Sequence, residues 1–165
     1  FDEALEKLQK IVETDTGTLH TYWKKWGSFT SPITTNLLVH EVAVAQYLLG
    51  DVMNIISREI EGDQLTLELQ HERGTAHIHI DRRKEDKKKY LTFATQDKTR
   101  YTLQDGTLMQ QTDDENNTIW TSSDTPLLTT ECEAFLSEIK NGSQGNKKRQ
   151  QRDIAVALVL ESLME

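Results

Sequence analysis

A chain of 165 residues, 36% of them hydrophobic and 28% charged, can form one domain with a single core and has the composition of a globular α+β or α/β protein. Its formal net charge of -8 argues against a general nucleic-acid-binding protein, because binding phosphates requires clustered Lys and Arg. No apolar run is long enough to cross a bilayer, and the acidic N-terminal stretch does not resemble a secretory signal. Cys132 is the single cysteine, so an intrachain disulfide is excluded and a cytoplasmic protein is favoured. We interpret Cys132 as a small core residue.

The N-terminal part of the chain predicts a helix, a strand and a second helix. Residues 2–13 carry apolar side chains at helical spacing. Residues 18–29 are rich in aromatic and β-branched side chains, which is typical of a strand, and Pro32 closes this stretch. Residues 36–49 are apolar on most sides of a helix that Gly50 ends, so we expect this helix to be buried.

The middle of the chain predicts a run of strands joined by tight turns. The expected strands are residues 53–60, 64–71, 76–83, 90–95, 101–103, 107–111 and 118–121. Arg73-Gly74 and Asp105-Gly106 each predict a hairpin turn. Tight turns between successive strands favour an antiparallel sheet.

The end of the chain predicts two more helices. Residues 128–139 form an amphipathic stripe that Asn141-Gly142 stops, residues 143–151 form a polar, basic loop, and an apolar helix starts at Asp153 and continues through Ile154, Leu158 and Leu163. Strands are thus segregated from helices, which predicts an α+β fold with an open, predominantly antiparallel sheet and helices on one face. We expect a single domain over residues 1–165. Because the chain lacks an initiator Met and stops within a predicted helix, we also expect it to belong to a longer polypeptide.

Common catalytic motifs are absent from the sequence: there is no G-x-G-x-x-G turn, phosphate loop, zinc motif or nucleophilic serine in a glycine elbow. The pair Asn36 and His40 remains. Four residues apart, they project from the same face of the predicted helix, where an imidazole could exchange a proton with a ligand hydroxyl near neutral pH. The alternative is a histidine at a helix start that backbone or water satisfies, and spacing alone favours this alternative.

Three histidines and a lysine cluster have ordinary explanations. His71, His77 and His79 fall on one predicted hairpin, with Glu68 opposite His79, so a weak metal site is conceivable. Histidine and glutamate on the polar face of an antiparallel pair are nevertheless common, and we favour that interpretation. The stretch 87–89, Lys-Lys-Lys, is interpreted as a solvated hairpin tip.

Three stretches together resemble a known family. Phe1–Leu19 is similar to a helix and glycine-marked turn that lead from a cofactor domain into a C-terminal domain. Asn36–Gly50, NLLVHEVAVAQYLLG, resembles a helix of the form D-x-x-x-H-D-I-D-x-x-x-Y-L-L-G. Thr130–Gly142 and Asp153–Glu161 resemble two closing helices. In this order the stretches resemble the C-terminal domain of the glucose–fructose oxidoreductase, inositol dehydrogenase and rhizopine-catabolism (Gfo/Idh/MocA) family.

The resemblance implies an oxidoreductase that passes hydride between NAD or NADP and a hydroxyl-bearing carbon of a sugar, sugar derivative or cyclitol. His40 would relay the hydroxyl proton or orient the substrate, and Asn36 would face it. Tyr22, Lys24 and Lys25 are weaker candidates for contacting the sugar, the alternative being a strand edge with solvated lysines. The missing N-terminal domain would bind the cofactor, so we expect none in this chain. The open sheet face would build a homo-oligomer.

The sequence also departs from the family pattern. Asn36 replaces an aspartate, and an amide can hydrogen-bond a hydroxyl but cannot act as a carboxylate base. Ala43 replaces a second aspartate, and residues 14–17 keep only part of the glycine turn. Two alternatives therefore stay open: a stand-alone dimerising or protein-interaction module, and a family member that binds a sugar without turning it over.

Overall fold

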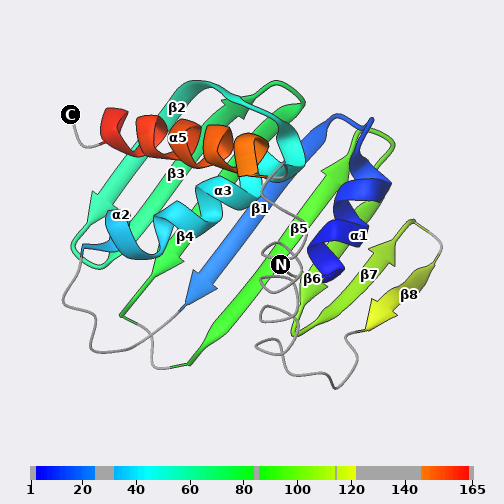
Figure 1. Ribbon diagram of the computed structural model, residues 1–165. Coiled ribbons are helices and arrows are strands. Elements are labelled where there is room, and N and C mark those ends of the chain that lie inside the picture. The colour runs from blue at the N-terminus through cyan, green and yellow to red at the C-terminus, as the bar shows by residue number, and fades with distance from the viewer. Residues whose placement is uncertain (1–2, 25–31, 84–85, 114, 122–145, 164–165) are drawn as a thin grey trace, which may run out of the picture.

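The computed structural model describes residues 3–24, 32–83, 86–113, 115–121 and 146–163. Within these residues, helices gather on one face of an eight-stranded sheet (Figure 1). The helices are α1 (Glu3–Val12), α2 (Ile33–Asn36), α3 (Leu38–Leu49) and α5 (Asn146–Ser162). The strands are β1 (Gly17–Lys24), β2 (Val52–Glu61), β3 (Gln64–His71), β4 (Gly74–Asp81), β5 (Lys88–Thr95), β6 (Arg100–Gln104), β7 (Thr107–Gln111) and β8 (Asn116–Thr121).

The first strand lies in the middle of the sheet rather than at its edge. The strand order is β2-β3-β4-β1-β5-β6-β7-β8, and β1 runs parallel to β4 and antiparallel to β5. The remaining neighbours pair antiparallel. The predicted α+β class, with an open and predominantly antiparallel sheet, is confirmed.

One of the two predicted hairpin turns is confirmed. Asp105 and Gly106 have φ angles of 48° and 73°, and they connect Gln104 to its partner Thr107. Two positive φ angles in a two-residue loop are the mark of a type I′ turn, whose twist matches that of the flanking strands.

The other predicted turn, at Arg73-Gly74, is displaced by one residue. The two residues before Gly74 form the turn, and Gly74 itself starts β4. The register therefore moves by two residues, so Glu68 lies opposite His77, and its predicted position opposite His79 is wrong.

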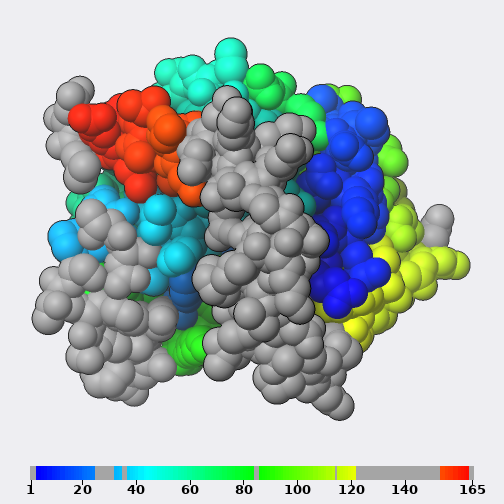
Figure 2. Space-filling model, viewed as in Figure 1, coloured from blue at the N-terminus to red at the C-terminus, as the bar shows by residue number. Residues whose placement is uncertain are grey.

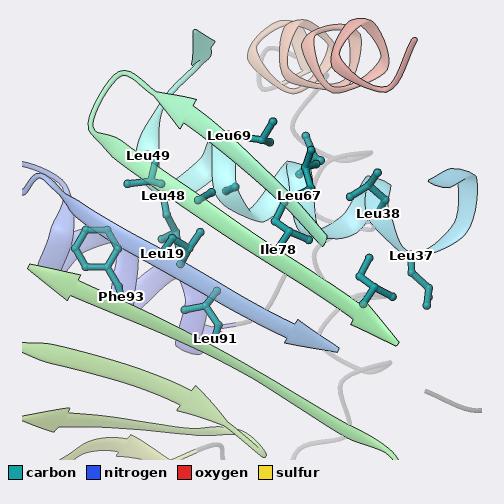
Figure 3. Close-up of a cluster of buried hydrophobic side chains, with 14 of the residues drawn as sticks. Leu19, Leu37, Leu38, Leu48, Leu49, Leu67, Leu69, Ile78, Leu91 and Phe93 are labelled. Carbon is teal, nitrogen blue, oxygen red and sulfur yellow. The ribbon is translucent and has the colours of Figure 1, made fainter. Parts of the chain in front are cut away.

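The core lies between the sheet and α3. Buried leucine, isoleucine and phenylalanine side chains of β1, β3, β4 and β5 alternate along their strands and point to the helices (Figure 3). In the space-filling view, α1 (blue) and α5 (red) lie at opposite ends of this helical layer (Figure 2). None of the described helices is long and apolar enough to cross a membrane.

The single helix predicted over residues 36–49 is interrupted. Asn36 ends α2, and α3 begins after Leu37. At this junction the N–H of His40 donates to the carbonyl of Leu37, three residues back, at 3.2 Å. Asn36 and His40 thus lie in consecutive helical segments, and the prediction of one continuous helix is wrong here.

The last helix starts earlier than predicted and turns a different face inward. It begins at Asn146, so residues 146–151, predicted as a loop, are helical. Val156 and Leu163 are buried, whereas Ile154 and Leu158 are each 60% exposed, because residues four apart share the outer face of this helix. The helix predicted over residues 128–139, including Cys132 and its stop at Asn141-Gly142, lies outside the described residues.

Two glycines allow β1 to enter the sheet. Gly17 of β1 is paired with Gly74 of β4, whose φ is 145°. A Cβ at position 74 would lie 1.8 Å from the carbonyl oxygen of Gly17. Only glycine leaves room for this close backbone approach, so the pair fixes where β1 starts against its neighbour.

We expect Gly74→Ala to lower the free energy of unfolding by more than about 2 kcal/mol, because it combines a backbone clash with a strained φ. Urea unfolding followed by circular dichroism measures this change. Gly62→Ala is the matched control: its φ of 57° is also left-handed, but nothing lies within 4 Å of the added Cβ, so it should cost about 1 kcal/mol. Equal losses in the two variants would contradict the close approach.

Candidate active site

The candidate catalytic histidine lies on the helical side of the sheet, near the end of β1. His40 is an exposed residue in the first turn of α3. Its ring centroid is 6.2 Å from that of Trp23, with the two rings tilted by 51°. Side chains alternate along β1, and the odd-numbered ones point toward the helices. Trp23 is one of these, so it is half-buried against the core. An imidazole that solvent can reach thus lies beside an indole.

A buried carboxylate lies directly after this histidine. Glu41 is 1% exposed, and its Oε1 is 3.1 Å from the ammonium of Lys89, at the start of β5. That ammonium also lies 4.0 Å from the ring centroid of Trp23, within cation–π range. Because burying an unpaired carboxylate is costly, Lys89 stabilises Glu41 in this position. We call His40, Glu41, Trp23 and Lys89 the α3 site.

The structure brings some of the predicted site residues together and separates others. His40 lies in the α3 site, whereas Tyr22 and Lys24 point to the opposite face of the sheet. The cause is the alternation of side chains along β1, which sends neighbours of Trp23 to the other side. Asn36 is the last residue of α2, and Lys25 lies outside the described residues.

Sequence reasoning missed Trp23, Glu41 and Lys89. Glu41 occupies the position of the aspartate that follows the family's histidine, which is the one signal that could have identified it. Lys89 was assigned to a solvated hairpin tip, and that prediction is wrong, because the residue belongs to β5 and pairs with Glu41. The pairing joins residues far apart in the sequence, so only the sheet topology reveals it.

The opposite face of the sheet carries a second group of polar aromatic side chains. We call His20, Tyr22, His77, His79 and Tyr90 the open-face cluster. The rings of His20 and His77 are stacked 4.7 Å apart, those of Tyr22 and His79 5.0 Å apart, and those of Tyr22 and Tyr90 5.1 Å apart. No described residue covers this face, since the described helices all lie on the other one (Figure 1).

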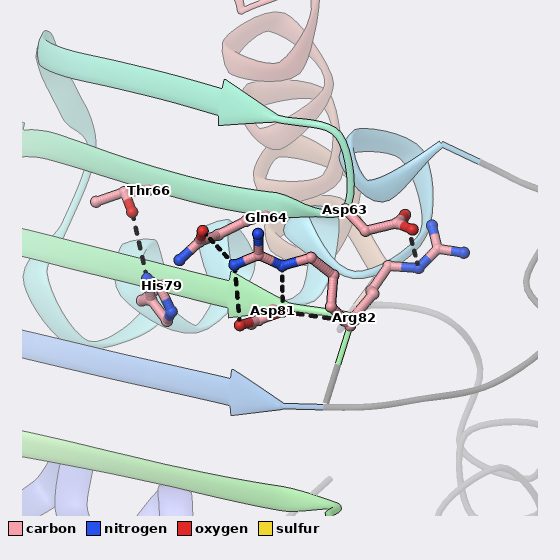
Figure 4. Close-up of polar contacts among 7 residues, drawn as sticks. Asp63, Gln64, Thr66, His79, Asp81 and Arg82 are labelled. Carbon is pink, nitrogen blue, oxygen red and sulfur yellow. Dashed lines mark hydrogen bonds and ion pairs between the residues drawn. The ribbon is translucent and has the colours of Figure 1, made fainter. Parts of the chain in front are cut away.

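Polar contacts surround the open-face cluster at one end. The Oγ1 of Thr66 lies 3.2 Å from Nδ1 of His79 (Figure 4). The guanidinium of Arg83 donates to the carboxylate of Asp81. That ion pair raises the pKa of Arg83. Lys24 lies 3.6 Å from Asp86. Lys88 lies at the same end, with its ammonium 5.3 Å from the ring centroid of Tyr90, so this end of the cluster carries both ion pairs and a lysine that lies over an aromatic ring.

The three histidines of the predicted hairpin do not converge. His71 lies on the helical face, where it is 1% exposed and its Nδ1 is 2.8 Å from the carbonyl oxygen of Gly50. Burial lowers the pKa of His71, so the ring is neutral at pH 7 and Nδ1 donates this hydrogen bond. Within the described residues, no three histidine, cysteine or acidic side chains are placed to hold a metal ion.

A shallow depression of about 310 Å³ lies at the other end of β1. It is lined by Thr14, Asp15, Thr16, Thr95, Gln96 and Asp97. The carboxylate of Asp97 already accepts hydrogen bonds from the hydroxyl of Thr95 and the backbone N–H of Thr99, which lower its pKa. This arrangement holds a turn in place and offers little to a ligand.

Solved structures share this fold, although no family model and no curated protein matches the sequence. A dehydrogenase (MviM) from Clostridium difficile matches with a TM-score of 0.80 over 99% of this chain and 58% of its own, at 11% identity. For UDP-N-acetylglucosamine 3-dehydrogenase GnnA from Acidithiobacillus ferrooxidans, the TM-score is 0.74 over 99% of this chain and 57% of its own, at 14% identity. A Gfo/Idh/MocA family oxidoreductase from Vibrio cholerae matches with a TM-score of 0.70 over 99% of this chain and 59% of its own, at 10% identity.

These matches define the class of fold. The chain has the α+β fold of the C-terminal domain of Gfo/Idh/MocA oxidoreductases, and the resemblance predicted from the three sequence stretches is confirmed at the level of the fold. The chain spans 57–59% of the length of these three structures. Their activities belong to proteins that are longer than this one.

We expect Lys89→Met to lower the free energy of unfolding by about 1–3 kcal/mol, because it leaves the Glu41 carboxylate buried without its counter-charge. The double variant Lys89→Met/Glu41→Gln removes that charge and should recover to within about 1 kcal/mol of the wild type. Urea unfolding of the wild type, the two single variants Lys89→Met and Glu41→Gln, and the double variant completes the cycle. Additive losses in the double variant would show that the two side chains do not interact.

Proposed function

We propose that this chain is the substrate-facing and oligomerising domain of an NAD(P)-dependent oxidoreductase that acts on a hydroxyl of a sugar, sugar derivative or cyclitol. The observation that carries the proposal is the exposed His40 beside Trp23, in a fold that dehydrogenases share. The activity of GnnA, named for a nucleotide-linked amino sugar, supports a sugar-type substrate.

The chemistry follows from the residues of the α3 site. Oxidation of an alcohol requires the hydroxyl to lose a proton while its carbon loses a hydride. Bound NAD or NADP supplies the hydride acceptor. The imidazole of His40 takes the hydroxyl proton, since a ring nitrogen without a proton can accept one from a bound hydroxyl. The indole of Trp23 provides apolar surface, and the Lys89–Glu41 pair provides positioned polar groups. Small-molecule sites combine these two kinds of surface.

The cofactor is assigned to a separate, N-terminal domain. The sequence has no glycine-rich turn between a strand and a helix, the usual cradle for the pyrophosphate of a dinucleotide. The α3 site would then meet the nicotinamide at the boundary between the two domains.

We therefore expect no binding of NAD(H) or NADP(H) by the 165-residue chain. Isothermal titration calorimetry with each cofactor tests this expectation. A titration curve with a micromolar Kd would place a cofactor site within this chain and contradict the assignment of the cofactor to a separate domain.

The open face of the sheet is assigned to self-association. The open-face cluster is aromatic, and two of the charged residues at its end, Lys24 and Asp81, form ion pairs within the chain. Aromatic enrichment with few charges is the composition of the centre of a protein interface. The occupant we propose is a second copy of this chain. A stand-alone dimerising module would use the same face, but it would leave the α3 site without a role.

We expect His40→Ala, in the polypeptide that carries the cofactor domain, to lower kcat by about 10²–10⁴-fold, the usual contribution of a positioned general base. NADH formation with a panel of sugars and cyclitols measures this loss. Lys10→Ala, an exposed side chain on α1, is the control and should leave turnover unchanged. Wild-type turnover in the His40 variant would remove this residue from the mechanism, and a chain that oxidises no member of the panel would favour the non-catalytic alternative.

A further inference from the structure

The basic stretch at residues 82–89 lies at the end of the sheet that carries the α3 site. This stretch, Arg-Arg-Lys-Glu-Asp-Lys-Lys-Lys, has six basic and two acidic residues in a chain whose net charge is -8. Its first residues directly follow β4, and its last two, Lys88 and Lys89, open β5. Lys88 lies opposite Lys24, and Lys89 lies opposite Trp23, at the end of β1. Positive charge from neighbouring strands is therefore gathered beside the candidate catalytic histidine.

Within this stretch, the side chain of Lys89 faces the helices. Side chains alternate along β5, so Lys88 points to the opposite face, where its ammonium lies over the ring of Tyr90. The ammonium of Lys89 instead lies 4.0 Å from the ring centroid of Trp23, and the same indole lies beside the imidazole of His40. The ammonium and the imidazole thus border one indole, where a single sugar-sized molecule can contact both.

The ion pair between Lys89 and Glu41 turns its positive end to solvent. The side chain of Glu41 is 2% exposed, whereas that of Lys89 is 47% exposed. A ligand can therefore reach the ammonium but not the carboxylate. An ammonium has three N–H donors, so its contact with one carboxylate oxygen leaves others for a ligand. Because Glu41 already holds the ammonium in place, binding a ligand there costs little side-chain entropy.

These features suit a ligand group that carries negative charge. Hydrogen bonds from an ammonium to a carboxylate or a phosphate are shorter and stronger than those between neutral groups. The excess of basic residues around Lys89 adds a positive potential, which attracts anions to this end of the sheet. A neutral hydroxyl would gain less from either effect.

We propose that the substrate is an anionic sugar derivative, whose carboxylate or phosphate group binds the ammonium of Lys89 while the hydroxyl to be oxidised lies at His40. The inference rests on the proposed function, and it adds the substrate class and the residue that selects it. No bond forms or breaks at Lys89, because the anionic group only anchors the substrate. Such an anchor stabilises the bound substrate and the transition state equally, so its removal raises KM and leaves kcat unchanged.

Paired substrates test this selectivity on the polypeptide that carries the cofactor domain. The members of each pair differ in an anionic group: glucose and glucose 6-phosphate, glucose and glucuronate, and N-acetylglucosamine and its UDP derivative. These pairs distinguish a phosphate monoester, a carboxylate and a diphosphate. Formation of NADH or NADPH gives kcat and KM for each sugar. We expect the anionic member of at least one pair to have a kcat/KM about 10–100-fold higher, the usual contribution of a hydrogen bond to a charged group.

The double variant Lys89→Met/Glu41→Gln removes the ammonium without leaving a buried, unpaired carboxylate. We expect it to raise KM for the preferred anionic sugar by about 10–100-fold at unchanged kcat, and to leave both constants for the neutral partner unchanged. Lys89→Arg keeps donors for a carboxylate or phosphate and should retain the preference. Glu41→Gln alone controls for the lost carboxylate and should also retain it. Lys10→Met removes an exposed lysine of α1 and should change neither constant.

The outcomes separate this inference from the proposed function. A polypeptide that oxidises no sugar or cyclitol, charged or neutral, overturns both. Oxidation without a preference for anionic members leaves the proposed function standing and overturns the substrate class. A preference that the double variant retains overturns the role of Lys89, as does a double variant whose kcat falls equally on charged and neutral sugars. Circular dichroism checks that the variants fold, and Lys89→Gln/Glu41→Gln replaces the double variant if it does not.

Discussion

The close backbone contact between Gly17 and Gly74 is the constraint on which the rest of the structure depends. It lets an N-terminal strand enter the middle of the sheet, parallel to β4, before the remaining strands complete it on both sides. Once this contact sets the register, the direction of every β1 side chain is fixed. Trp23 must then point to α3, and Tyr22 must point away from it.

The two faces of the sheet consequently carry different chemistry. On the helical face, Lys89 reaches across to the buried carboxylate of Glu41 and lies against Trp23, so an ion pair stabilises the start of the helix that presents His40. On the other face, histidine and tyrosine rings stack on one another, with ion pairs and lysines at one end. The proposed ligand site and the proposed surface for a second copy therefore lie on opposite faces of one sheet.

Local patterns predicted the elements well but could not predict their long-range partners. Alternation and turn residues were sufficient for the strands and for the hairpin at Asp105-Gly106, because neighbours in the sequence determine these features. The parallel pairing of β1 with β4 and the contact of Glu41 with Lys89 join distant segments, so no local signal reports them. The sequence does not predict the helix break at Leu37, because the residues around it suit a continuous helix equally well.

The alternation along β1 also separates two kinds of evolutionary change. Odd-numbered positions such as 19, 21 and 23 face the helices, whereas even-numbered ones such as 20, 22 and 24 face the side that no described helix covers. Under the proposed function, substitutions in one set would change the preference for a ligand without changing self-association, and substitutions in the other set would do the reverse. A single inserted residue within the strand would exchange the two sets and disturb both properties at once.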